Sequence, residues 1–153
     1  MSQTCPSRVA LVCLGVGAVV LACRCGSSGD AAPTSIAWQS WWDGRKLARA
    51  DDKPMLVDFT ADWCPPCREL DGRTLVDPRV VATLTRNYVP IKIDVDDQAQ
   101  LAKAFRVRDL PTLVLLAPNG EELSRVTGFQ PPTAFRRWLI RNVPRRTDGA
   151  ADT

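Results

Sequence analysis

Short apolar runs alternate with stretches of helical periodicity between residues 36 and 143, and this alternation limits the fold more than any other feature. No internal repeat and no second linker interrupts it. Alternating strands and helices are typical of an α/β domain, in which helices cover a central sheet. A chain of 153 residues is long enough for one such core, so we expect a single domain.

The expected elements follow the order helix, strand, two helices, strand, helix, two strands and a closing helix. Strands are predicted at 55–59, 89–95, 113–116 and 123–127. Helices are predicted at 38–50, from about 65, from 78, after 96 or 97, and at 132–142. Pro118-Asn119-Gly120 is a turn signal, so the last two strands should form a hairpin.

Several residues indicate where these helices begin and which faces they bury. Pro65 and Asp77-Pro78 are typical of first turns, where proline needs no N–H and aspartate accepts free N–H groups. Asp96 or Asp97 should cap the helix that follows them, while Gly44 weakens the first helix. The expected buried faces are Val80, Val81 and Leu84, then Leu101, Ala104 and Phe105, and finally Phe135, Trp138 and Leu139.

Composition excludes several classes of function. Twenty basic and seventeen acidic residues give a net charge of +3, and 45% of residues are hydrophobic, as in ordinary globular proteins. We therefore expect no nucleic-acid partner. The chain has no histidine, which removes the commonest metal ligand and the usual general base of serine and cysteine hydrolases. Its reactive groups are six cysteines, four of them before residue 26.

Residues 9–23 form an apolar run that is shorter than the roughly 20 residues needed to span a bilayer. The run predicts a signal peptide over residues 1–22. Val20-Leu21-Ala22-Cys23 resembles the lipobox of bacterial lipoproteins, which implies lipidation at Cys23. A simply cleaved signal and an uncleaved short anchor are the alternatives. All three place the domain outside the cytoplasm, on the periplasmic side of a membrane.

Residues 23–35 are predicted to be an anchor and flexible linker, because 26–35 consists mostly of Gly, Ser and Ala. As a coil this linker reaches roughly 15 to 20 Å. The folded domain is expected at 36–143 and a disordered tail at 144–153. Without the residues before 26, the chain has 18 basic and 17 acidic residues, a net charge of +1.

A basic face is predicted at the end of the chain. It consists of Arg136, Arg137, Arg141, Arg145 and Arg146. Such a face is either a solvated helix end or a surface attracted to lipid headgroups.

Trp63-Cys64-Pro65-Pro66-Cys67 places two thiols three positions apart at the expected start of a helix, close enough to form a disulfide. A helix N-terminus stabilises a thiolate through its free N–H groups and partial positive charge. We therefore predict that Cys64 is the attacking sulfur and that Cys67 resolves the mixed disulfide. Asp58 is the one acid in a predicted buried strand, an inconsistency of the kind found at functional sites.

The segment from Asp58 to Cys67 resembles the active-site strand and loop of thioredoxins, and Leu110-Pro111-Thr112 resembles their cis-proline turn. The resemblance covers residues 53–142. It implies a thioredoxin fold, with a central mixed sheet of about four strands flanked by helices and preceded here by an N-terminal helical extension. Segments 53–64, 77–80 and 126–129 further resemble the C-terminal periplasmic domain of DsbD-type thiol:disulfide interchange proteins.

The resemblance implies roles for particular residues. Cys64 is similar to the family's nucleophile and Cys67 to its buried partner in a redox-active disulfide. Pro111 is similar to the cis-proline that helps to present the substrate backbone. Asp58 resembles the buried acid near the second cysteine, and Lys92 falls where the family has a lysine close to that acid.

Four further residues belong to the active-site loop and the substrate-presenting turn. These are Trp63, Pro65, Pro66 and Leu110. Pro65-Pro66 and Leu110 differ from the residues more familiar in the family at these positions, and both positions influence redox poise. The direction of electron flow therefore stays open.

The preferred function is a protein-disulfide reductase that uses no bound cofactor and no metal. Its partners would be disulfide-containing substrate proteins and a membrane electron donor, and it would be a monomer held to the membrane by the N-terminal lipid. A thiol oxidase, an isomerase and a reductant in cytochrome c maturation are alternatives. A metal-relay lipoprotein that binds metal through Cys25, Cys64 and Cys67 is an alternative of another class.

Overall fold

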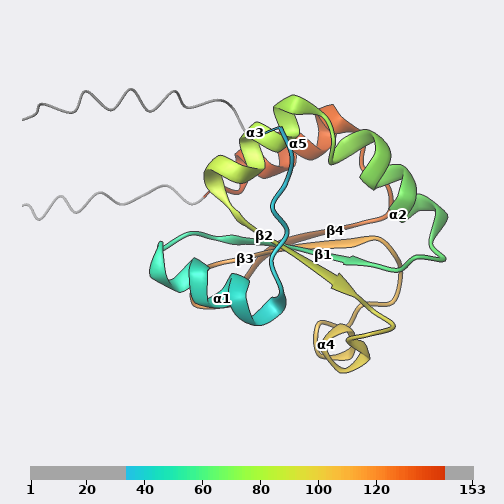
Figure 1. Cartoon of the computed structure of the whole chain (residues 1–153), viewed down its shortest axis with the longest axis horizontal. Coiled ribbons are helices and arrows are strands. Elements are labelled where there is room, and N and C mark those ends of the chain that lie inside the picture. Colours follow the sequence, from blue (N-terminus) through green and yellow to red (C-terminus); the bar gives the residue numbers. More distant parts are fainter. Residues whose placement is uncertain (1–33, 144–153) are drawn as a thin grey trace, which may run out of the picture. The chain divides into compact units, whose positions relative to one another are not determined.

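A computed structural model describes residues 34–143, in which four strands form one mixed sheet (Figure 1). The strands are β1 (Met55–Thr60), β2 (Val89–Asp94), β3 (Thr112–Leu116) and β4 (Glu122–Thr127). Their order across the sheet is β2-β1-β3-β4, with β2 parallel to β1 and the other two pairs antiparallel. The predicted mixed sheet of four strands and the predicted hairpin are confirmed.

Helices cover both faces of this sheet (Figure 1). They are α1 (Trp41–Ala50), α2 (Pro65–Glu69), α3 (Pro78–Asn87), α4 (Ala99–Ala104) and α5 (Pro132–Arg141), with a π-helical turn η1 (Leu70–Thr74) directly after α2. Met55, Val57 and Phe59 of β1 pack with α1 and α4, whereas Leu56 packs with η1, α3 and α5. The alternation of side chains along a strand therefore places Asp58 on the same face as Leu56.

The predicted inner faces of α3 and α5 are confirmed, since Val80, Val81, Leu84, Phe135, Trp138 and Leu139 are all buried. Asp77 caps α3 as predicted, because its carboxylate accepts the N–H groups of Arg79 and Val80. Tertiary packing therefore follows the helical periodicity in these two elements.

The predictions for α4 are wrong in two respects. The N-cap is Gln98, one or two residues later than the expected Asp96 or Asp97, and it makes no side-chain capping bond. The Asp96 carboxylate instead accepts a hydrogen bond from Trp63 and so is not used as a cap. Leu101 and Phe105 pack against the core as predicted, but Ala104 is exposed and Ala102 is the buried residue of this short helix.

Helix α1 begins at Trp41, three residues later than predicted, because Ser40 caps it by accepting the N–H of Asp43. Gly44, expected to weaken the helix, allows a close approach to the sheet. A Cβ at this position would overlap with Cγ1 of Ile91 in β2. A larger residue at position 44 would therefore force Ile91 to move where α1 packs on β2.

Among residues 34–143, no helix has both the length and the apolar character needed to cross a bilayer. The predicted signal peptide, the lipidation site Cys23, most of the linker and the predicted tail lie outside the described residues.

Candidate active site

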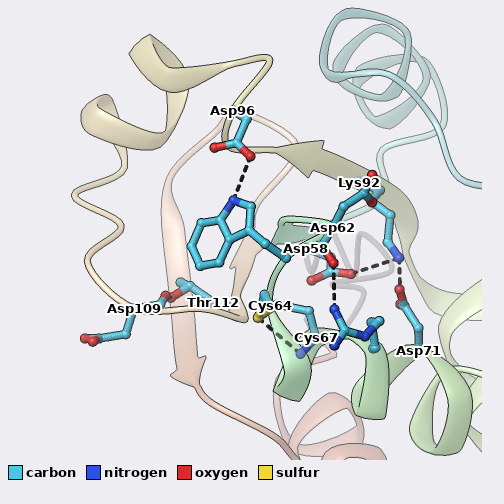
Figure 2. Close-up of a disulfide and its surroundings, with 11 residues drawn as sticks. Asp58, Asp62, Cys64, Cys67, Asp71, Lys92, Asp96, Asp109 and Thr112 are labelled. Atoms are coloured by element: carbon cyan, nitrogen blue, oxygen red, sulfur yellow. Dashed lines mark hydrogen bonds and ion pairs between the residues drawn. A yellow bond between two sulfur atoms is a disulfide. The ribbon is translucent and has the colours of Figure 1, made fainter.

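A disulfide joins Cys64 to Cys67 at the start of α2, with an S–S distance of 2.10 Å and Cα atoms 5.3 Å apart (Figure 2). Cys64 is the N-cap of the helix, and its Sγ accepts the backbone N–H of Cys67 at 3.2 Å. Pro65 and Pro66 occupy the first turn, where backbone N–H groups have no intrahelical partner, so their lack of an N–H costs no hydrogen bond. The structure thus brings the two predicted cysteines together at a helix N-terminus.

The disulfide lies in a small apolar environment, and each cysteine is only 2% exposed. Ala61 packs with the two cysteines, and Leu110 packs against the same cluster. The Leu110–Pro111 peptide bond is cis. These contacts place the predicted proline turn beside the disulfide.

Trp63 lies on the surface next to the disulfide and is 64% exposed. Its indole N–H donates to Oδ2 of Asp96 at 2.7 Å, and Asp96 follows the end of β2 (Figure 2). This bond holds a large ring in one orientation at the edge of the site. The sequence analysis did not identify Asp96 as a partner of Trp63.

Asp58 is 1% exposed, and neither of its carboxylate oxygens has a hydrogen-bond partner among residues 34–143. The parallel register pairs Asp58 with Lys92, and the Lys92 Nζ lies 3.6 Å from Oδ2 of Asp58. That separation is an ion-pair contact but is too long for a hydrogen bond. The expected Asp58–Lys92 pair is therefore present in the structure.

Lys92 has a closer partner that the sequence analysis missed. Its Nζ donates to Oδ1 of Asp71 in η1 at 2.6 Å, so Lys92 lies between two carboxylates (Figure 2). The ammonium group also lies 5.0 Å from the centre of the Trp38 ring. Asp71 follows Cys67 by four positions, and this helical spacing was the one signal that could have identified it.

Burial raises the pKa of Asp58 to about 7, because a carboxylate without hydrogen bonds is poorly solvated there. The Lys92 ammonium acts in the opposite direction and lowers this pKa, while the Asp71 carboxylate raises it. Asp58 is therefore an acid that can take up or release a proton near neutral pH.

A cleft of about 600 Å³ opens beside the site. Its lining includes Cys67, Lys92 and Asp71, but not Asp58 or Cys64. Solvent in this cleft reaches the groups around the buried acid. Within residues 34–143, no group of three or more His, Cys, Asp or Glu side chains is arranged to hold a metal ion.

A disulfide at a helix start, with the buried acid Asp58 nearby, can accept and return two electrons. This is the chemistry of thiol:disulfide oxidoreductases. The fold and the site place the chain in that class. Residues 43–141 match the family model of the thioredoxin-like domain, and the chain belongs to that family.

Curated relatives include two thiol:disulfide interchange proteins named DsbD. The protein of Haemophilus ducreyi is 33% identical over 63% of this chain, and that of Yersinia pestis is 36% identical over 64%. These matches cover only 18% and 17% of the two relatives. The chain therefore corresponds to a small part of each of them.

Solved structures give the same fold. The thioredoxin of Thermus thermophilus is 31% identical with a TM-score of 0.65, covering 70% of this chain and 86% of that one. The reduced C-terminal domain of Neisseria meningitidis DsbD is 26% identical with a TM-score of 0.58, covering 66% and 92%. The described part of this chain thus corresponds to most of each of these two solved chains.

Proposed function

We propose that this chain is a protein-disulfide reductase that acts outside the cytoplasm through Cys64 and Cys67. The observation that supports this most is the disulfide at the start of α2, backed by an acid whose pKa is about 7. Relatives named thiol:disulfide interchange proteins support the same chemistry.

In the proposed reaction, the Cys64 thiolate attacks one sulfur of a substrate disulfide, and the other substrate sulfur leaves as a thiolate. The Cys67 thiol then passes its proton to Asp58 and attacks the Cys64 sulfur. The bond between Cys64 and the substrate breaks, the second substrate thiolate leaves, and the Cys64–Cys67 disulfide forms. Two electrons pass from the enzyme to the substrate, so no bound cofactor or metal is needed.

The residues around the disulfide support substrate positioning. Pro111 and Leu110 lie beside the disulfide and would present the substrate backbone to Cys64. The exposed Trp63 would cover one side of the bound segment. Pro65 and Pro66 begin α2 and hold Cys64 at the helix N-terminus.

The direction of electron flow is tested by the reduction potential of the Cys64–Cys67 pair, measured with the fragment 26–153 in thiol buffers of known potential. A reductase is expected at or below about −230 mV, near thioredoxin. It then needs an electron donor, which we place in the membrane. A value above about −180 mV would contradict the proposal and favour a thiol oxidase or isomerase.

We also propose that residues 1–22 are a lipoprotein signal and that residues 23–35 tether the domain through lipidated Cys23. The apolar run at 9–23 and the lipobox-like sequence before Cys23 support this. In a bacterial host, radiolabelled palmitate should label the full chain, and Cys23→Ala should abolish the label. A labelled Cys23→Ala protein, or an unlabelled parent chain, would contradict lipidation.

A further inference from the structure

A groove between α3 and α5 carries five arginines from two separate parts of the sequence. Two hollows of about 320 and 420 Å³ share Arg79, Arg136 and Ile140, so they form one groove. The arginine groove comprises Arg79, Arg86, Arg136, Arg137, Arg141 and Ile140. Packing of α5 on α3 therefore adds Arg79 and Arg86 to the predicted basic face, of which Arg145 and Arg146 lie outside the described residues.

Within residues 34–143, no ion pair balances the charge of this groove. Helices α3 and α5 contain no acidic residue, and none of the five arginines forms an ion pair within the described part of the chain. Asp77 borders the groove, but its carboxylate is occupied in capping α3. All five arginine side chains are exposed, so their guanidinium groups can bind anions.

The groove also has an apolar element, since Ile140 is 48% exposed in its centre. The Arg136 Nε donates to Oγ1 of Thr83, which fixes one arginine across the two helices. An array of guanidinium groups around an exposed aliphatic side chain matches the boundary between phosphate headgroups and acyl chains.

The first described residues of the domain pack on the side that carries this groove. Ile36 and Trp38, near the first described residue, pack against the core that α3 and α5 cover. In Figure 1 the described chain begins beside α3 and α5. A tether that joins the domain at residue 34, as proposed above, would therefore be attached on this face.

We propose that the arginine groove binds the anionic phospholipid headgroups of the membrane from which the domain is tethered. A net charge of only +1 for residues 26–153 gives little general attraction to an anionic surface, so binding must come from the local cluster. The proposal does not depend on the thiol chemistry, and membrane binding can be measured without it.

The test uses the oxidised fragment 26–153, which lacks the predicted lipid and apolar run. Flotation should recover it with vesicles of phosphatidylcholine containing one quarter phosphatidylglycerol, but not with vesicles of phosphatidylcholine alone. The groove variant Arg79→Gln/Arg86→Gln/Arg136→Gln should bind about a hundredfold more weakly, because each basic residue near an anionic surface contributes about fivefold.

The control variant Lys46→Gln/Arg49→Gln/Lys103→Gln removes the same charge from exposed positions on α1 and α4. It should keep its vesicle affinity within a few-fold. Equal losses in both variants, or no binding to phosphatidylglycerol, would overturn the proposal. Displacement by millimolar glycerol 3-phosphate would also overturn it, because the groove would then be a small-anion site. Disulfide reduction by the groove variant should stay unchanged.

Discussion

Replacing Cys64 by serine should abolish disulfide reduction, lowering the rate by at least about a thousandfold, because a covalent nucleophile is lost without an alternative. The variant should still fold, since the lost disulfide closes a loop of only four residues and lies at the edge of the core. The measurement is the turnover of a protein disulfide by the fragment 26–153, with circular dichroism as the check on folding.

Replacing Cys67 by serine should give a different result. Cys64 can still attack, but no thiol is left to resolve the intermediate, so substrate proteins stay attached through a mixed disulfide. Non-reducing electrophoresis should show adducts that disappear on reduction, and they should be absent from the Cys64→Ser/Cys67→Ser protein. Adducts on Cys64→Ser but not on Cys67→Ser would show that Cys67 is the nucleophile and Cys64 the resolving cysteine. Neither adducts nor a loss of activity in either variant would exclude thiol exchange.

The sheet and its flanking helices were predictable because they depend on local signals. The turn at Pro118-Asn119-Gly120 defines the hairpin, and the Asp77 cap begins α3 where the sequence indicated. Asp58 could be singled out because an acid interrupts a buried apolar run, and its register partner Lys92 followed from the family resemblance.

The parts that the sequence did not predict depend on contacts between elements. Asp71 matters only because η1 faces β2, so that its carboxylate competes with Asp58 for Lys92. The sequence predicted Asp96 as a helix cap, but its carboxylate accepts a hydrogen bond from Trp63. Gly44 looked like a weak point, but it lies against Ile91. Such roles follow from tertiary packing, which overrides local propensity.

Replacing Asp58 by asparagine should slow disulfide exchange at neutral pH and remove its dependence on pH near 7. In the proposed mechanism Asp58 accepts the Cys67 proton, and it can do so only when ionised, above a pKa of about 7. A general base of this kind contributes roughly a hundredfold or more. Stopped-flow measurements of substrate reduction between pH 5 and 9 should show an inflection near pH 7 in the parent protein and none in the variant.

The same substitution should stabilise the oxidised protein above neutral pH. Because the folded pKa of Asp58 is raised from 3.8 to about 7, the folded state keeps a proton that the unfolded state releases. In the parent, the contribution of the protonated Asp58 to stability is fully present below about pH 4 and is lost as pH rises through 7. Between pH 5 and 8, the free energy of unfolding of the parent should fall by about 2 to 3 kcal/mol relative to Asp58→Asn.

The neighbours of Asp58 distinguish a titrating acid from one that is merely buried. Asp71→Asn should lower the pKa of Asp58, because it removes a negative charge and frees Lys92. Lys92→Met should raise it, because the nearby cation is lost. The pH inflection of the exchange rate should move in the same two directions. A rate inflection that stays in place in both variants, together with the same dependence of stability on pH in the parent and in Asp58→Asn, would make Asp58 a structural residue. The Cys67 proton would then be assigned to solvent in the adjoining cleft.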